Sequence, residues 1–128
     1  MSIPTKRSIA VLIRNGNLIL STRRADNDGE FPGVWGLPAG TYRGSETLEE
    51  LVVRIGRDKL GVTLIPTRKL GGGSQERERY TLDMEIWEAE MSGVPQHPAW
   101  KWATPDILQP GSINGSLCCS LALEILRN

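Results

Sequence analysis

The residues most able to do chemistry lie between positions 46 and 59, where seven of fourteen side chains are charged. Carboxylates three or four residues apart share one face of a helix. Such a face can supply the hard oxygen ligands that a divalent cation prefers. Three glutamates come first, and Arg54, Arg57 and Lys59 come later, with Asp58 among them. The segment therefore suits either a metal held by carboxylates or a phosphate bound directly by Lys and Arg.

The flanking residues predict a loop, a helix and a stop. A bend at 36–40 and a second bend at 43–45 precede the charged segment. We expect Ser45 to cap the helix, because its hydroxyl can accept a free backbone N–H. Glu46, Glu49 and Glu50 then fill the first turns, where negative charge suits the helix dipole. Gly61 is placed to end the helix in a left-handed conformation.

The stretch from Trp35 to Val62 resembles the Nudix box, G-x5-E-x7-R-E-U-x-E-E-x-G-U, in which U is aliphatic. Gly40, Glu46, Arg54, Gly61 and Val62 stand in register with it, and the lead-in 31–38 is also similar. The resemblance implies a single Nudix domain, 1–128, of the α/β class: an α/β/α sandwich with a mixed β-sheet. It also implies hydrolysis of nucleoside diphosphate-linked compounds, with Mg²⁺ or Mn²⁺ as cofactor.

This sequence departs from the box where the family's glutamates bind metal. Those positions hold Ile55, Asp58 and Lys59. Two unit charges about 4 Å apart interact by roughly 4 kcal/mol at an effective dielectric of 20, so a lysine there opposes a cation. Asp58 keeps one metal position and Glu50 is a further acid on the same helix, so the predicted metal residues are Asp58 and Glu50. We expect Mg²⁺ or Mn²⁺ to bind weakly and hydrolysis to be impaired.

Several roles remain open for the box residues. Carried over from the family, Glu46 and Arg54 keep the supporting catalytic positions. Arg54 instead suits an i, i+4 ladder with Glu50 and Asp58. A relocated metal site would need acids from the later loop and strand, at Glu76, Glu78, Glu85 and Glu88. The alternative function is a catalytically inactive nucleotide-binding or scaffolding domain, in which Lys59 and Arg54 bind phosphates without metal.

The substrate-binding residues we predict are Arg23, Trp35, Gly40 and Lys59. Trp35 lies beside the flexible bend, where a base could stack on it. Trp87, Trp100 and Trp102 fit packing better, and solvated charge is the simpler role for Arg23. At 100° per residue, Lys59 falls on the apolar side of the helix with Leu48, Leu51, Val52 and Ile55.

The remaining chain alternates strands and turns around the box. Asn15-Gly16 predicts a tight hairpin, Pro66 predicts an edge strand or a bulge, and Gly71–Ser74 predicts a flexible loop. Ser116 is expected to cap a final helix packed on the sheet. The predicted strands are 8–14, 17–23, 63–70, 78–90 and 100–103, and the final helix is 117–126.

Composition excludes several partners. The 128 residues include 15 Lys or Arg and 15 Asp or Glu, so no bulk charge favours a nucleic acid polymer or an anionic membrane. No apolar run approaches a membrane span, and the first residues lack the apolar part of a signal peptide. Adjacent Cys118 and Cys119 suit packing in a reduced cytoplasmic protein, and His97 alone does not suit zinc. The expected partner is a small-molecule nucleotide derivative, and a homodimer is compatible because dimers are common among similar proteins.

Overall fold

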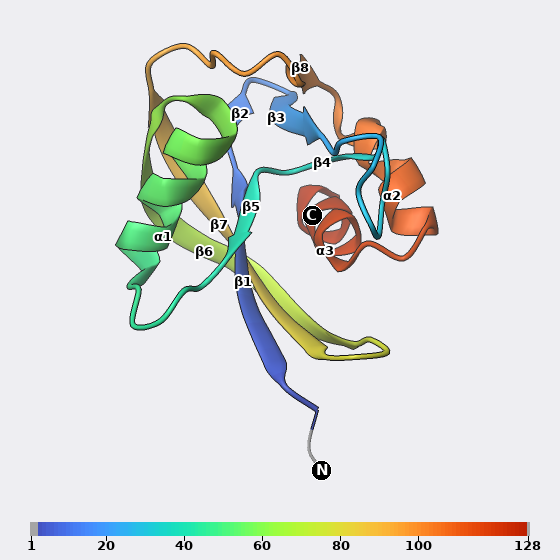
Figure 1. Ribbon diagram of the computed structural model, residues 1–128. Helices are drawn as coiled ribbons and strands as arrows, with labels where there is room; N and C mark the ends of the chain where they lie inside the picture. Colours follow the sequence, from blue (N-terminus) through green and yellow to red (C-terminus); the bar gives the residue numbers. More distant parts are fainter. Residues whose placement is uncertain (1–2, 128) are drawn as a thin grey trace.

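The computed structural model describes residues 3–127, in which crossing strands separate helices on two sides (Figure 1). The strands are β1 Thr5–Leu12, β2 Arg14–Asn15, β3 Leu18–Arg23, β4 Trp35–Gly36, β5 Ala39–Thr41, β6 Thr63–Glu76, β7 Thr81–Ser92 and β8 Trp100–Ala103. The helical elements are α1 Leu48–Ile55, the π-helical turn η1 Gly56–Leu60, the 3-10 turn η2 Pro105–Leu108, α2 Gln109–Ile113 and α3 Leu117–Leu126.

The predicted mixed sheet is confirmed, in the order β5-β1-β7-β6. Strands β1 and β7 run parallel, with Thr5 opposite Thr81 and Leu12 opposite Glu88, while β5 and β6 pair antiparallel with their neighbours. A second sheet is built on β3, which pairs antiparallel with β2, β4 and β8. The hairpin at Asn15-Gly16 joins β2 to β3, and Gly16 has a φ of 62°.

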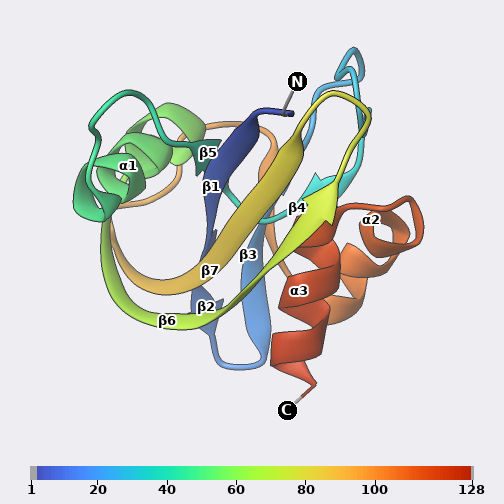
Figure 2. The same cartoon turned by 90° about the horizontal axis from the view of Figure 1, so that it is seen from below.

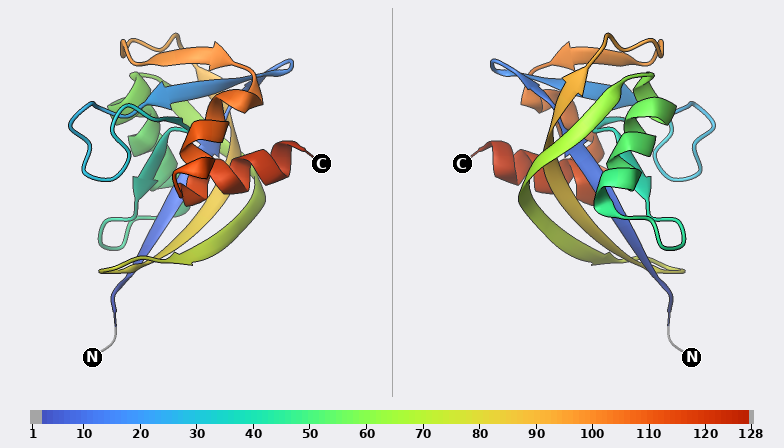
Figure 3. Two further views of the ribbon diagram at one scale, coloured as in Figure 1. Left: turned by 90° about the vertical axis from the view of Figure 1, so that its right-hand side faces the viewer. Right: turned by 90° about the vertical axis from the view of Figure 1, so that its left-hand side faces the viewer.

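Strand β1 carries both halves of the core, because its side chains alternate between the two faces of the sheet. Ile9 and Val11 pack on the side of α1, with Leu51, Val52 and Ile55. Ala10 and Leu12 pack on the other side, with Cys119, Ala122 and Leu123 of α3. Figure 3 shows α1 and α3 on opposite faces of the strands. The predicted α/β/α sandwich is confirmed, and it fixes α1 in place beside the end of β5.

The predicted loop at Gly71–Ser74 is wrong, because β6 runs through it without interruption. The glycines let helix α3 approach the strand closely (Figure 2). A Cβ at Gly71 would lie 3.1 Å from Ile125 Cδ1, and one at Gly73 would lie 3.1 Å from Leu121 Cδ2. The bulge predicted near Pro66 is present between Pro66 and Arg68, on this edge strand.

The predicted cap of α1 at Ser45 is also wrong, since the helix begins two residues later. Thr47 is the N-cap: its Oγ1 accepts the Glu50 N–H at 3.2 Å. Glu50 Oε1 accepts the Thr47 N–H in return, at 2.9 Å. This reciprocal capping box satisfies more backbone donors than a single hydroxyl, and it leaves Glu46 in the loop before the helix.

Helix α3 begins where it was predicted. Ser116 is its N-cap, and the Ser116 hydroxyl accepts the Cys119 N–H at 3.3 Å. Burial raises the pKa of the Cys119 thiol, which is only 1% exposed. Across residues 3–127, no helix has both the length and the apolar character needed to span a membrane.

Candidate functional site

An open cavity of about 900 Å³ lies where the end of α1 meets β5, the loop before Trp35, the β6–β7 turn and the start of α3. This volume suits a small-molecule ligand such as a nucleotide. The lysines and arginines that line it are Lys6, Arg23, Arg24, Arg43, Arg54, Lys59 and Arg77. The carboxylates that line it are Asp28, Glu30 and Asp58. Four of these cations are ion-paired, Arg23 with Asp26, Arg24 with Asp28, Arg54 with Glu46 and Arg77 with Glu30. The positive charge that favours an anionic ligand therefore comes from the other three lining cations, Lys6, Arg43 and Lys59.

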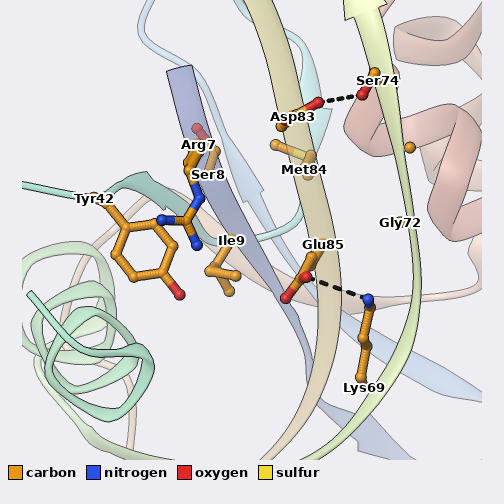
Figure 4. Close-up of a pocket in the computed structure, with 11 residues that line it drawn as sticks. Arg7, Ser8, Ile9, Tyr42, Lys69, Gly72, Ser74, Asp83, Met84 and Glu85 are labelled. Carbon is orange, nitrogen blue, oxygen red and sulfur yellow. Dashed lines mark hydrogen bonds and ion pairs between the residues drawn. The ribbon is translucent and has the colours of Figure 1, made fainter. Parts of the chain in front are cut away.

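A second cavity, of about 310 Å³, lies over strands β1, β7 and β6 on the side of α1 (Figure 4). Its cations are Arg7 and Lys69, and its carboxylates belong to Asp83 and Glu85. Lys69 Nζ lies 3.2 Å from Glu85 Oε2, and the Arg7 guanidinium lies 4.8 Å from the Tyr42 ring centroid. Because its cations and carboxylates balance, this smaller cavity is a weaker candidate for an anion than the larger one.

Arg54 joins helix α1 to the loop that follows β5. Arg54 Nε donates to Glu46 Oε2 at 2.8 Å, and Arg54 Nη2 donates to Glu46 Oε1 at 2.8 Å and to the Thr41 carbonyl at 2.7 Å. Both charged side chains are 13% exposed. The hydrogen bonds from Arg54 hold the pKa of Glu46 at about 2, so this carboxylate stays ionised at neutral pH. The pair therefore fixes the loop against the helix.

The predicted ladder of Arg54 with Glu50 and Asp58 is wrong. Glu50 is occupied by the capping box, and Asp58 Oδ1 accepts from Arg57 Nε at 3.0 Å. Asp58 lines the cavity, whereas Glu50 lies outside the lining formed by the described residues. The structure therefore does not bring the two predicted metal residues together.

Gly40 and Ile55 form a close contact at the base of the cavity. A Cβ at Gly40 would lie 3.0 Å from Ile55 Cγ1 and 3.3 Å from Leu51 Cδ1. Ile55 is only 1% exposed. Gly40 is thus needed so that β5 can approach α1, and an apolar side chain fills the place where the family's first metal-binding glutamate would stand.

The predicted position of Lys59 on the apolar side of the helix is wrong. Leu60 is buried instead, with no exposed surface, while Lys59 is exposed and lines the cavity. The reason is that the chain leaves α-helical geometry after Ile55 and continues as the π-helical turn η1.

Arg23 and Trp35 pair across β3 and β4, but their side chains differ in position. Arg23 lines the cavity, and its Nη2 lies 2.6 Å from Asp26 Oδ1. Trp35 is outside the lining formed by the described residues. Lys101 Nζ lies 4.6 Å from the Trp35 ring centroid and covers one face of the ring. The geometry favours a cation–π packing role for this tryptophan over base stacking.

One cluster of residues that line the larger cavity was not predicted from the sequence. It lies where the loop before Trp35 meets the β6–β7 turn. The Arg77 guanidinium lies 5.3 Å from the Phe31 ring centroid and 5.8 Å from that of Tyr80. The Tyr80 hydroxyl donates to Glu30 Oε2 at 2.9 Å, and burial raises the pKa of Tyr80. The predicted strand 78–90 includes Tyr80, but no local pattern shows that residues 30 and 77 meet.

Comparison of the chain with models of known protein families identifies its family. Residues 4–116 match the model of the NUDIX domain. The chain belongs to the Nudix family.

Among curated proteins, nucleoside triphosphatase NudI of Salmonella schwarzengrund (strain CVM19633) is 40% identical over 57 residues, which are 44% of this chain and 40% of that protein. The match thus spans about two-fifths of the relative's length. NudI of Salmonella arizonae (strain ATCC BAA-731 / CDC346-86 / RSK2980) matches over the same shares.

Solved structures share the Nudix fold over nearly the whole chain. The E. coli ORF135 protein has a TM-score of 0.76 and 21% identity, over 98% of this chain and 92% of that one. The MutT protein from Methanosarcina mazei Go1 has a TM-score of 0.77 and 22% identity, over 99% and 96%. At these identities the likeness shows the fold alone.

Nudix hydrolases generally use divalent metals such as Mg²⁺ or Mn²⁺. The donor set of this chain does not fit such an ion. Across residues 3–127, no group of three or more His, Cys, Asp or Glu side chains is placed to hold a metal. At the end of the Nudix helix, Asp58 is ion-paired with Arg57 and stands beside Lys59, so cations surround the one carboxylate there.

Proposed function

We propose that the larger cavity binds the phosphate groups of a nucleotide derivative directly through its lysines and arginines, and that the family's metal-dependent hydrolysis is impaired. The observation that carries this proposal is the excess of cations in the lining, with Lys59 at a position where the Nudix box has a metal-binding glutamate. Arg54 and Glu46 act as positioning residues, because they hold the loop after β5 against the helix. Arg23 and Lys59, which were both predicted from the sequence to bind substrate, are proposed to contact the phosphates.

The chemistry of the cavity supports an anionic, partly aromatic ligand. Lysine and arginine form charge-assisted hydrogen bonds to phosphate oxygens. Phe31, Tyr42 and Tyr80 line the same space and could contact the apolar part of a nucleoside. Arg77 is held between Phe31 and Tyr80 by their rings and by an ion pair with Glu30, which keeps its guanidinium ordered before a ligand binds.

Calorimetry with ADP, in EDTA and in excess Mg²⁺, tests this proposal. We expect the affinity in EDTA to be no lower than in Mg²⁺. Lys59→Ala should weaken binding by about tenfold, the loss of one charge-assisted hydrogen bond. Lys69→Ala is the matched control, because Lys69 is paired with Glu85 at the smaller cavity. Binding that is seen only with added Mg²⁺ would refute the proposal.

A second candidate function is metal-dependent hydrolysis of a nucleoside triphosphate, for which a metal site would have to form elsewhere in the cavity. The similarity to nucleoside triphosphatase NudI over 57 residues favours this substrate class. An assay of phosphate and pyrophosphate release from a panel of nucleoside triphosphates, with and without Mn²⁺, separates the two functions. Turnover that requires Mn²⁺ supports the second, and binding without turnover supports the first.

A further inference from the structure

Two cations of the larger cavity lie opposite each other on neighbouring segments of the chain. Strands β1 and β5 pair antiparallel with Ser8 opposite Thr41, and the Ser8 and Thr41 hydroxyl oxygens lie 2.9 Å apart. The backbone hydrogen bonds continue one residue past the end of β5, at 2.9 Å. Since side chains alternate between the two faces of a sheet, the next pair on the face of Ser8 and Thr41 is Lys6 and Arg43. All four side chains line the larger cavity.

This pair of like charges is not compensated by the residues around it. Like charges directly opposite each other destabilise a pair of strands. The ion pairs within residues 3–127 include neither Lys6 nor Arg43. Lys6 Nζ lies 4.2 Å from the Tyr80 ring centroid, which attracts the ammonium but does not neutralise it. Glu30, which accepts the Tyr80 hydroxyl, is already ion-paired with Arg77. A bound anion would therefore stabilise this arrangement.

The Lys6 and Arg43 pair lies apart from Lys59. Gly40 lies against Ile55 in the last turn of α1, because a Cβ at Gly40 would be 3.0 Å from Ile55 Cγ1. Arg43 follows Gly40 by three residues, which span about 10 Å of extended chain at roughly 3.3 Å per residue. Neighbouring phosphates of a diphosphate share one bridging oxygen and are closer together than that. The second cationic position therefore suits a second anionic group of the ligand.

We propose that Lys6 and Arg43 form a second phosphate-binding position, for a phosphate group that is separated from the one bound at Lys59. The ligand class is then a nucleotide with two separated phosphate groups. The second group is either a phosphate on the ribose or the far end of a long 5′-polyphosphate, since both present the same charged oxygens to Lys and Arg. This inference rests on the proposed function, which assigns the first phosphate to Lys59.

Calorimetry in EDTA tests the second position in the wild-type protein. Adenosine 3′,5′-bisphosphate is compared with AMP, and adenosine 5′-tetraphosphate is compared with ADP. We expect the additional phosphate to lower the Kd about tenfold in one of the two comparisons, the gain from one charge-assisted hydrogen bond. A gain with the bisphosphate identifies a ribose phosphate, and a gain with the tetraphosphate identifies a polyphosphate. No gain in either comparison would overturn the inference.

Matched variants show whether the gain comes from this position. Lys6→Met removes the charge but keeps an apolar stem beside Tyr80, and it should reduce the gain to less than about twofold. Arg7→Met is the control, because Arg7 is the neighbour of Lys6 on β1 but lines only the smaller cavity (Figure 4). It should keep the tenfold gain. Arg43→Met repeats the test from the other strand if Lys6→Met does not fold.

The results separate this inference from the proposed function. A gain that persists in both Lys6→Met and Arg43→Met, or that is lost equally in Arg7→Met, would overturn the second position. If the wild type binds ADP in EDTA but shows no gain from an additional phosphate, the inference has failed and the proposed function has not. If ADP does not bind in EDTA, the proposed function has failed, whereas a gain that Lys6→Met removes would still support the second position.

Discussion

Two parts of the Nudix box have diverged in different ways. Glu46, in the loop before the helix, and Arg54, in the last turn of α1, keep the residues of the family pattern and form a bidentate pair that ties the loop to the helix. In the turn that follows α1, Asp58 and Lys59 stand where the family has glutamates, and the backbone itself changes to a π-helical turn. The difference separates two tasks of the box. The Glu46–Arg54 pair holds the scaffold together, and that task does not depend on a metal. The turn after α1 sets the charge presented to the ligand, and here that charge is largely positive.

The largest effect that tests this comparison is expected from Ile55→Glu, which restores a family carboxylate at a position only 1% exposed. An unpaired carboxylate buried against Gly40 should destabilise the fold by about 3 kcal/mol. Ile55→Met, the control, should cost less than about 1.5 kcal/mol because it conserves volume. Urea unfolding measures both. A stable Ile55→Glu protein would show that the helix end can still open to form a metal site.

An intermediate effect on stability is expected when the pH is lowered until Glu46 of the Glu46–Arg54 pair is protonated. The pKa of Glu46 is lowered from 4.5 to about 2, so its pairing contributes stability that is present above pH 4.5 and is lost as pH falls through about 2. Glu46→Gln should therefore lose less stability than the wild type between those pH values. Asp28, whose pKa is also about 2 because the Phe31 N–H donates to it, is the same in both proteins and does not affect the difference. If the free energy of unfolding falls in parallel with pH in the wild type and in Glu46→Gln, the role given to the Glu46–Arg54 pair is contradicted.

The smallest effect is expected at the N-cap of helix α1. Thr47→Ala removes the hydroxyl that accepts the Glu50 N–H and should destabilise the protein by about 1 kcal/mol. Ser45→Ala should change stability by less than about 0.5 kcal/mol, because Ser45 lies before the capping box. Thermal unfolding of the two variants side by side checks this, and equal effects would mean that the cap assignment is wrong.

The sandwich was predicted from the resemblance to the Nudix box, and several of its turns and caps were predicted because their signals are local. The hairpin at Asn15-Gly16, the αL stop at Gly61 and the cap at Ser116 each depend on a few neighbouring residues, and all three are confirmed. Gly71–Gly73 was misread because glycine permits both a flexible loop and the close approach of a helix. Only the position of α3 decides between them.

The candidate site was less predictable because it depends on contacts between distant segments. The helical wheel assumed one period throughout, so it could not show that Leu60 would replace Lys59 in the core. The partner of Arg54 lies eight residues away, beyond the reach of an i, i+4 rule. The ion pair of Arg77 has no local signal, since its partner Glu30 lies 47 residues earlier in the chain.

Anomalous diffraction from a crystal soaked with Mn²⁺ and ADP separates direct phosphate binding by Lys59 from a metal-dependent site. We expect ADP phosphates in contact with Lys59 and no ordered Mn²⁺ peak beside Asp58. A well-ordered Mn²⁺ bound to Asp58, with Lys59 turned away from the phosphates, would contradict it and would restore a metal-dependent site at the end of the Nudix helix.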